Sequence, residues 1–325
     1  MPKPTSKQLL NLLHEDANQS LPMLSDELRR RNFPVSRQSV GQFISRLEDE
    51  KKIFYTIVEN PNIRGARTFF IEIKTNPEEP EIVLKLQEIH HVRSIDGIIG
   101  QNSLVFKCCT RDDQELSSIL KQLDLLITHT RFQHYKIINC LRTFKDGGFT
   151  FPQERQDLMI NKIEACLLDI MQDMEEPFPI LSIMEKASMK GFPLSYNQAS
   201  RMVRKLRNEM YCIPTIKISP DYIQQTDFPL KFYLQILPKN LSEYDIIAAE
   251  TLAPKDEIVD LYRTGEEYGL FAVVRTSSIS DYRQFLEAMY RTGKIQDTIS
   301  TLVIDEKLPA IFKPFKENSL TTIMQ

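Results

Sequence analysis

The chain has 325 residues, a formal net charge of −3 and a composition that is 42% hydrophobic and 9% aromatic. This composition excludes a chain that is disordered throughout, and the length predicts two or more domains. No apolar run approaches the roughly 18 residues of a membrane span, and the first residues lack the apolar stretch of a secretory signal. We therefore expect a soluble protein that is cytoplasmic and nucleoid-associated and has no membrane contact.

The cysteine count and the charge distribution bear on disulfides, metal sites and polyanion binding. The five cysteines are an odd number without a C-x-x-C pair, so neither a disulfide framework nor a zinc site is predicted, and no cofactor or metal is expected. Residues 1–75 carry 12 Lys and Arg against 9 Asp and Glu, whereas residues 239–325 carry 10 against 14. A polyanion would therefore bind the first quarter best.

The first 76 residues read as a winged helix-turn-helix domain. Three amphipathic helices are predicted over Ser6–Glu15, Leu24–Arg31 and Ser36–Lys51, with Ser36 as the N-cap of the third. Two β-rich stretches follow, Lys52–Val58 and Arg67–Ile73, and the turn-rich segment between them predicts a hairpin that forms the wing.

The third predicted helix has side chains suited to contacting DNA bases. Its apolar stripe is Val40, Phe43, Ile44 and Leu47, which leaves a polar face on the opposite side. Arg pairs with guanine and Gln with adenine in the major groove, and exposed cations contact phosphate. The predicted DNA-binding residues of this domain are Arg37, Gln38, Ser39, Gln42, Ser45 and Arg46, with Arg64 and Arg67 on the wing.

Residues 77–148 predict a second kind of domain. The strand Ser103–Cys109 and the helix Asp112–Leu120 belong to a β-α-β pattern with a further helix and strand. Alternating strands and amphipathic helices are typical of a ferredoxin-like βαββαβ sandwich, an antiparallel sheet with helices on one face. The Gly-Gly pair in Lys145–Gly148 predicts a linker at its end.

Both domains occur twice. Leu21-Pro-Met-Leu-Ser25 returns as Phe178-Pro-Ile-Leu-Ser182, and Phe33-Pro-Val-Ser36 returns as Phe192-Pro-Leu-Ser195, each followed by a matching apolar skeleton. We predict an α+β fold in which two winged helix-turn-helix domains (1–76 and 149–238) alternate with two ferredoxin-like domains (77–148 and 239–325). The second set of DNA-binding candidates is Tyr196, Asn197, Gln198, Arg201, Arg204 and Lys205.

This order of domains resembles the Lrp/AsnC (feast/famine) transcription regulators. Gly100-Gln-Asn-Ser-Leu-Val-Phe-Lys107 is similar to the family's Gly-x-Tyr/Asn-Asp entry to a strand, and Gly265-Glu-Glu-Tyr268 is a looser match. One face of each predicted sheet has no helices, and we expect the sheets of the two modules to cover these faces by packing face to face. The resemblance implies a fused dimer that binds double-stranded DNA, whose ferredoxin-like modules pair with each other, and it allows a homodimer of such chains. It also implies an effector cleft, here lined by Gly100, Gln101, Asn102, Ser103, Gly265 and Tyr268. Ser103 stands where amino-acid-binding members have Asp.

Two alternatives remain open beside this sequence-specific regulator. Winged helices also serve as protein-interaction scaffolds. In layout the chain is similar to the sirohaem decarboxylases, which need His or Arg to hold carboxylates and supply a proton. The candidates for that chemistry are His90, His91, His129 and His134. No catalytic residue is assigned in the main interpretation, which predicts that the chain is not an enzyme.

Overall fold

The chain folds into two compact units, each assembled from separate stretches of sequence. The computed structural model describes residues 3–75, 81–89, 91–128, 134–151, 158–174 and 177–316. Unit 1 comprises residues 1–63, 157–227 and 310–325, and unit 2 comprises residues 64–156 and 228–309. Unit 1 thus gathers the helical parts of both predicted winged domains, and unit 2 gathers both predicted ferredoxin-like modules.

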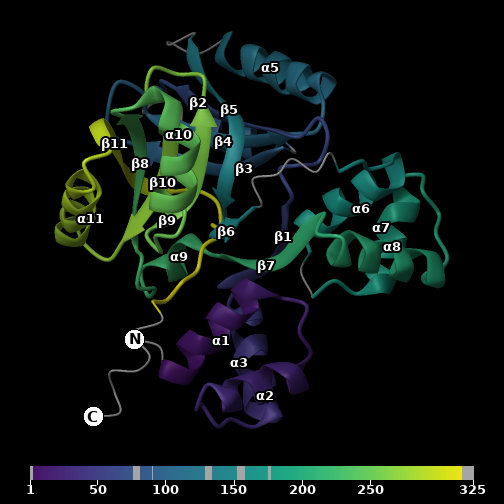
Figure 1. Cartoon of the computed structure of the whole chain (residues 1–325). Helices are drawn as coiled ribbons and strands as arrows, with labels where there is room; N and C mark the ends of the chain where they lie inside the picture. Colours follow the sequence, from purple (N-terminus) through teal and green to yellow (C-terminus); the bar gives the residue numbers. More distant parts are fainter. Residues whose placement is uncertain are drawn as a thin grey trace. The chain divides into compact units, whose positions relative to one another are not determined.

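Unit 1 contains two groups of three helices (Figure 1). They are α1 (Pro4–Glu15), α2 (Leu21–Arg30) and α3 (Arg37–Asp49), then α6 (Lys162–Gln172), α7 (Ile180–Met189) and α8 (Tyr196–Asn208). The third helix of each group begins at the predicted serine. The Ser36 hydroxyl accepts a hydrogen bond from the amide of Ser39, and Ser195 caps α8 in the same way through Gln198. The helical half of the sequence prediction is therefore confirmed.

The predicted wing hairpin is wrong. Each helix group is followed by one strand, β1 (Ile53–Glu59) or β7 (Cys212–Ile218), and these two strands pair antiparallel with each other. The short helix α9 (Pro220–Ile223) follows β7. The stretch Arg67–Ile73, assigned to the wing, forms β2 in the sheet of unit 2. The chain therefore changes units after Ile63, ahead of the boundary predicted at residue 76.

In the two-stranded sheet of β1 and β7, one threonine from each repeat forms a hydrogen bond with a helix of the other repeat. Thr56 and Thr215 are register partners, and both are fully buried. The Thr56 hydroxyl donates to the carbonyl of Gln172 at the end of α6, while the Thr215 hydroxyl donates to the carbonyl of His14 in α1. Each strand thus satisfies a helix-end carbonyl of the other repeat, which ties the two helix groups together.

Removing the second of these hydroxyls tests the exchange. Thr215→Val keeps the shape of the side chain but leaves the His14 carbonyl without this donor. We expect the free energy of unfolding to fall by about 1–3 kcal/mol, the cost of losing a buried hydrogen-bond partner. Denaturant titration measures it, with Thr150→Val on an exposed strand position as the control. Equal stability of the two variants would contradict the role given to Thr215.

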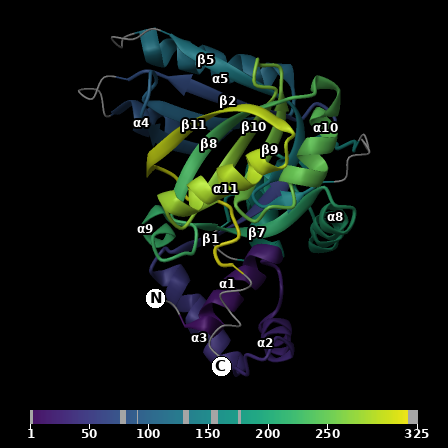
Figure 2. The ribbon, with the colours of Figure 1, turned by 60° about the vertical axis from the view of Figure 1, so that its left-hand side comes forward.

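Unit 2 is an eight-stranded closed barrel (Figure 2). The strands of the first module are β2 (Arg67–Ile73), β3 (Val92–Ile98), β4 (Leu104–Thr110) and β5 (Tyr135–Asp146). Those of the second are β8 (Leu230–Pro238), β9 (Ile258–Thr264), β10 (Leu270–Thr276) and β11 (Ile295–Glu306). The order β5-β2-β4-β3-β11-β8-β10-β9 closes on itself because β9 pairs with β5.

Helices cover the outside of each module, as the ferredoxin-like pattern requires. They are α4 (Glu81–Gln87) and α5 (Asp113–Thr128) in the first module, and in the second a 3₁₀ turn (Leu241–Glu243), α10 (Tyr244–Ile246), a π-helical turn (Ile247–Leu252) and α11 (Ile279–Arg291). Each packs on one hydrophobic cluster. Both modules have the βαββαβ order, but the first strand of each, β2 or β8, comes before the boundary predicted at residue 77 or 239. Their sheets join edge to edge, where the sequence predicted two separate sheets packed face to face.

The predicted linker at Lys145–Gly148 is a tight turn instead. Gly147 and Gly148 have φ values of 58° and 90° and connect β5 to the two-residue strand β6 (Phe149–Thr150). The positive φ values explain the Gly-Gly pair, since other residues rarely adopt them. A glycine pair therefore marked a hairpin inside unit 2 rather than a boundary.

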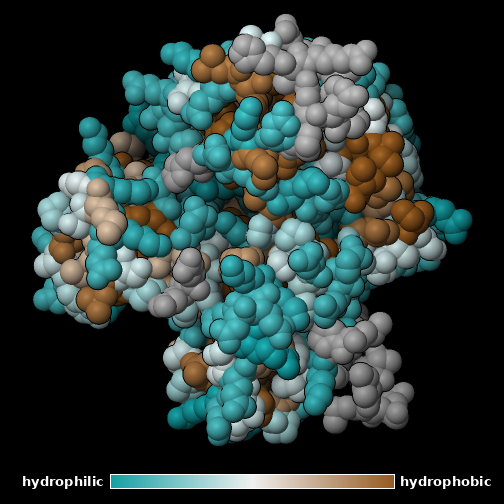
Figure 3. Space-filling model, turned by 180° about the vertical axis from the view of Figure 1, so that it is seen from behind, coloured by the Kyte–Doolittle hydropathy of each residue, from teal (hydrophilic) through white to brown (hydrophobic). Residues whose placement is uncertain are grey.

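The surface of the molecule is mixed. Hydrophilic residues cover most of the face in Figure 3, and hydrophobic residues gather there in several separate groups. Over the described residues, no helix combines the length and apolarity needed to cross a membrane.

Candidate functional site

Aromatic side chains pack in the interior of the barrel. Side chains alternate along each strand, so the face opposite the helices points inward. There the ring of Phe70 lies 5.8 Å from that of Tyr233, 5.4 Å from that of Tyr262 and 4.6 Å from that of Phe271, measured between centroids. These are ordinary aromatic packing distances, so this part of the barrel is a solid core.

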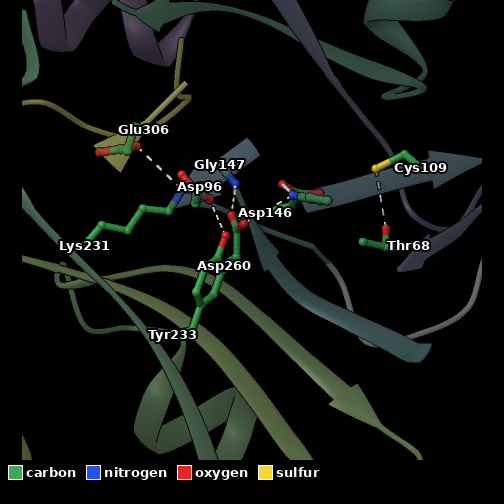
Figure 4. A network of polar contacts seen from close by, with 10 residues as sticks. Thr68, Asp96, Cys109, Asp146, Gly147, Lys231, Tyr233, Asp260 and Glu306 are labelled. Carbon is green, nitrogen blue, oxygen red and sulfur yellow. Dashed lines mark hydrogen bonds and ion pairs between the residues drawn. The ribbon is translucent and has the colours of Figure 1, made fainter. Parts of the chain in front are cut away.

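A first buried ionic cluster lies around Lys107, whose partners Asp146 and Asp260 are labelled in Figure 4. Its ammonium is 2.6 Å from Asp146 and 3.2 Å from Asp260, and Asp260 also accepts the backbone N–H of Gly147 at 2.7 Å. Burial raises the pKa of Asp146 to about 6, although Lys107 opposes this. Burial would lower the pKa of Lys107, but the two aspartates raise it above its ordinary value. The lysine comes from one module and Asp260 from the other.

A second buried ionic cluster also joins a lysine of one module to a carboxylate of the other. Lys231 of the second module lies 2.8 Å from Asp96 of the first and 3.5 Å from Glu306. Tyr233 donates to Asp96, and Arg275 pairs with Glu306. Burial raises the pKa of Asp96, whereas Arg275 and Lys231 hold that of Glu306 low despite its burial. Both clusters are nearly closed to solvent, so they hold the modules together rather than meeting a substrate.

A group of exposed and partly buried basic side chains lies at one end of the first module. We call it the basic rim: Arg64, Arg67, His91, Arg93 and Arg111. Register brings these residues together, because Arg67 begins β2 opposite Thr110, and Arg111 follows Thr110. The amide of Cys109 donates to the carbonyl of His91 at 3.1 Å.

The backbone of the rim is shaped locally. Arg93 sits where the β3–β4 register shifts between Val92 and Ser94, and such irregularities redirect side chains. Burial raises the pKa of the Cys108 and Cys109 thiols, and the nearby Arg93 opposes that rise. Gly65, with φ of 87°, allows its chain to approach the Arg111 carbonyl, since a Cβ there would lie 2.3 Å from that oxygen.

Acidic residues position part of the rim. Arg67 pairs with Asp113 at 2.9 Å, and the His91 Nδ1 atom is 3.8 Å from Glu115. Glu115 also accepts the amide of Arg111 at 2.7 Å. The rim thus places planar guanidinium groups, which pair well with carboxylates, beside an imidazole ring.

The two histidine candidates that the structure describes, His91 and His134, lie at opposite ends of β2. The His91 side chain is mostly buried, with 18% of its surface exposed. His134 precedes Tyr135, which pairs with Ile73 at the other end of β2 from Arg67. His90 and His129 lie outside the described residues.

The predicted DNA-binding face of α3 is exposed, with differences in detail. Exposed positions are Arg37, Gln38, Ser39, Gln42, Ser45 and Arg46. Phe43, predicted to be buried, is only half-buried. Arg64 and Arg67 were assigned to the wing. Both belong to unit 2 instead, since β1 and β2 lie in different sheets.

On α8, the candidates divide into exposed and engaged residues. Tyr196, Asn197, Arg201 and Arg204 are exposed. Gln198 completes the capping box, and Lys205 pairs with Glu164 at 2.7 Å. DNA contact stays a prediction for every residue of both sets.

The predicted effector residues lie on two different turns. Gly100, Gln101, Asn102 and Ser103 connect β3 to β4, where Asn102 donates to Glu72 at 2.8 Å. Gly265 and Tyr268 connect β9 to β10, where Tyr268 donates to Asp297 at 2.6 Å. The effector cleft and the homodimer stay predictions.

Comparison with known proteins gives a full-length structural match. No protein-family model and no curated protein sequence matches the chain. The crystal structure of the siroheme decarboxylase NirDL matches 98% of this chain and 96% of that chain, with a TM-score of 0.58 and 14% identity. Its co-complex with an iron-uroporphyrin III analogue matches 99% and 100%, with a TM-score of 0.57 and 13% identity. AsnC of E. coli matches 48% of this chain and 100% of its own, with a TM-score of 0.38 and 21% identity.

These matches correct the main functional expectation. Over 98% of its length the chain has the fold of the siroheme decarboxylase NirDL. The prediction of a DNA-binding transcription regulator is therefore wrong, and so is the prediction that the chain is not an enzyme.

Proposed function

We propose that the chain is an enzyme that decarboxylates a tetrapyrrole bearing several carboxylate side chains. The observation that carries the proposal is the full-length likeness to NirDL, because it covers 98–99% of this chain and 96–100% of that chain. The basic rim supports it, since a polycarboxylate needs several cations to hold it.

The rim residues suit the steps of such a reaction. Arg93 and Arg111 bind carboxylate groups of the macrocycle, for which the planar guanidinium is well shaped. Decarboxylation breaks the bond between the side-chain carbon and its carboxyl carbon. Carbon dioxide leaves, and the electron pair remains on the substrate, where the ring system delocalises it. His91, whose Nδ1 atom lies 3.8 Å from Glu115, donates the proton that completes the product.

Binding of iron-uroporphyrin III tests the first of these steps. We expect the full chain to shift the Soret band of the porphyrin in a saturable titration. Arg93→Gln removes one charge-assisted contact and is expected to weaken binding by about tenfold or more. Arg283→Gln, a solvent-exposed change on α11, is the matched control and should bind as the unaltered chain does. A chain that leaves the Soret band unchanged at all concentrations would overturn the proposal.

A further inference from the structure

Unit 1 contains a groove that the proposed reaction does not use. It has a volume of about 660 Å³ and lies between α1, α3 and α9. Its floor is aliphatic, formed by Leu9, Leu28, Val40 and Leu47, all at most 2% exposed. Volumes of roughly 300–1,000 Å³ are usual for small-molecule sites.

Basic side chains line the edge of this groove. The guanidinium of Arg46 lies over the ring of Phe43 at 5.2 Å, and both side chains line the groove. Within the described ranges of the chain, Arg46 forms no ion pair. Lys52 pairs with Glu50, and its ammonium lies 5.3 Å from the ring centre of Tyr222. Three cations, Lys3, Arg46 and Lys52, line the groove against one acid, Glu50, so the lining carries a net positive charge.

We infer that this groove binds a carboxylate with a hydrocarbon body, such as a medium-chain fatty acid. The aliphatic floor takes the hydrocarbon, and Arg46 takes the carboxylate through a charge-assisted hydrogen bond. An apolar floor beside this excess of positive charge discriminates against a neutral or cationic amphiphile of the same length. This site is independent of the basic rim, which belongs to unit 2.

Calorimetric titration with sodium decanoate, below its micellar concentration, tests the inference on the full chain. We expect saturable binding at one site, about tenfold tighter than for octanoate because two more methylenes are buried. Arg46→Gln should weaken decanoate binding by about tenfold or more. Arg37→Gln is the control, because Arg37 is exposed on the same helix but does not line the groove.

Three results would overturn the inference. Decyltrimethylammonium could bind as tightly as decanoate, Arg46→Gln and Arg37→Gln could bind decanoate alike, or the titration could fail to saturate at one site. The outcome is separate from that of the porphyrin titration, since Arg46 and the basic rim are changed by different substitutions. Loss of decanoate binding in Arg46→Gln with an unaltered Soret shift would show the groove to be a site of its own.

Discussion

Replacing Lys107 with methionine is expected to lower the free energy of unfolding by about 3–5 kcal/mol near neutral pH. The substitution keeps the length of the side chain but leaves Asp146 and Asp260 buried without their common cation. Breaking a buried ion pair from one side carries a cost of this size, because the remaining charge stays out of water. Urea denaturation monitored by circular dichroism gives the value. Lys307→Met, which removes a surface ion pair with Asp305, should cost about 1 kcal/mol or less.

The loss in Lys107→Met should depend on pH in a defined direction. The pKa of Asp146 is already raised by burial to about 6, and removing Lys107 raises it further. A carboxyl whose pKa is higher in the folded than in the unfolded chain favours folding as it takes up its proton. The variant should therefore lose stability as pH rises from about 4 through about 6 and above. A loss that is the same at pH 4 and pH 8, or smaller than about 1 kcal/mol, would contradict the account of this cluster.

The second large effect is expected at His91. His91→Gln should lower the rate of decarboxylation by about 10²–10⁴-fold, the usual contribution of a positioned acid. Glutamine can retain a polar contact but cannot donate a proton of suitable acidity. Porphyrin affinity should change by less than about threefold, because the arginines hold the carboxylates. Rates from single-turnover reactions and affinities from Soret titrations separate the two effects.

His134→Gln is the control for this prediction, since His134 lies at the opposite end of the sheet. Similar rates for the two variants would remove His91 from the role of proton donor. An equal loss of binding and rate in His91→Gln would make it a substrate-holding residue instead.

The helices and modules could be predicted because their patterns are local. The stripe of Val40, Ile44 and Leu47 predicts one buried face of α3, and the serine before it supplies the cap. Strand partners are not local. Ile53–Glu59 reads as a strand, but nothing in it distinguishes pairing with the following stretch from pairing with Cys212–Ile218, which comes more than 150 residues later.

The buried ionic clusters could not be predicted for a similar reason. Lys107 shares a strand face with Val105, and a lysine there normally indicates a solvent-facing position. Only the second module turns that face inward and supplies Asp260. The sequence predicted part of the basic rim, since His91 was a candidate for proton transfer. Arg93 and Arg111 were missed because sequence spacing does not show that β3 and β4 bring them to one end of the sheet.

The most direct test is to incubate the full chain with siroheme and follow the substrate by mass spectrometry. The account predicts products that have lost carbon dioxide, formed by the unaltered chain and by His134→Gln, and formed far more slowly by His91→Gln. An unchanged mass after complete binding of the tetrapyrrole would contradict the assignment of the chain as a decarboxylase.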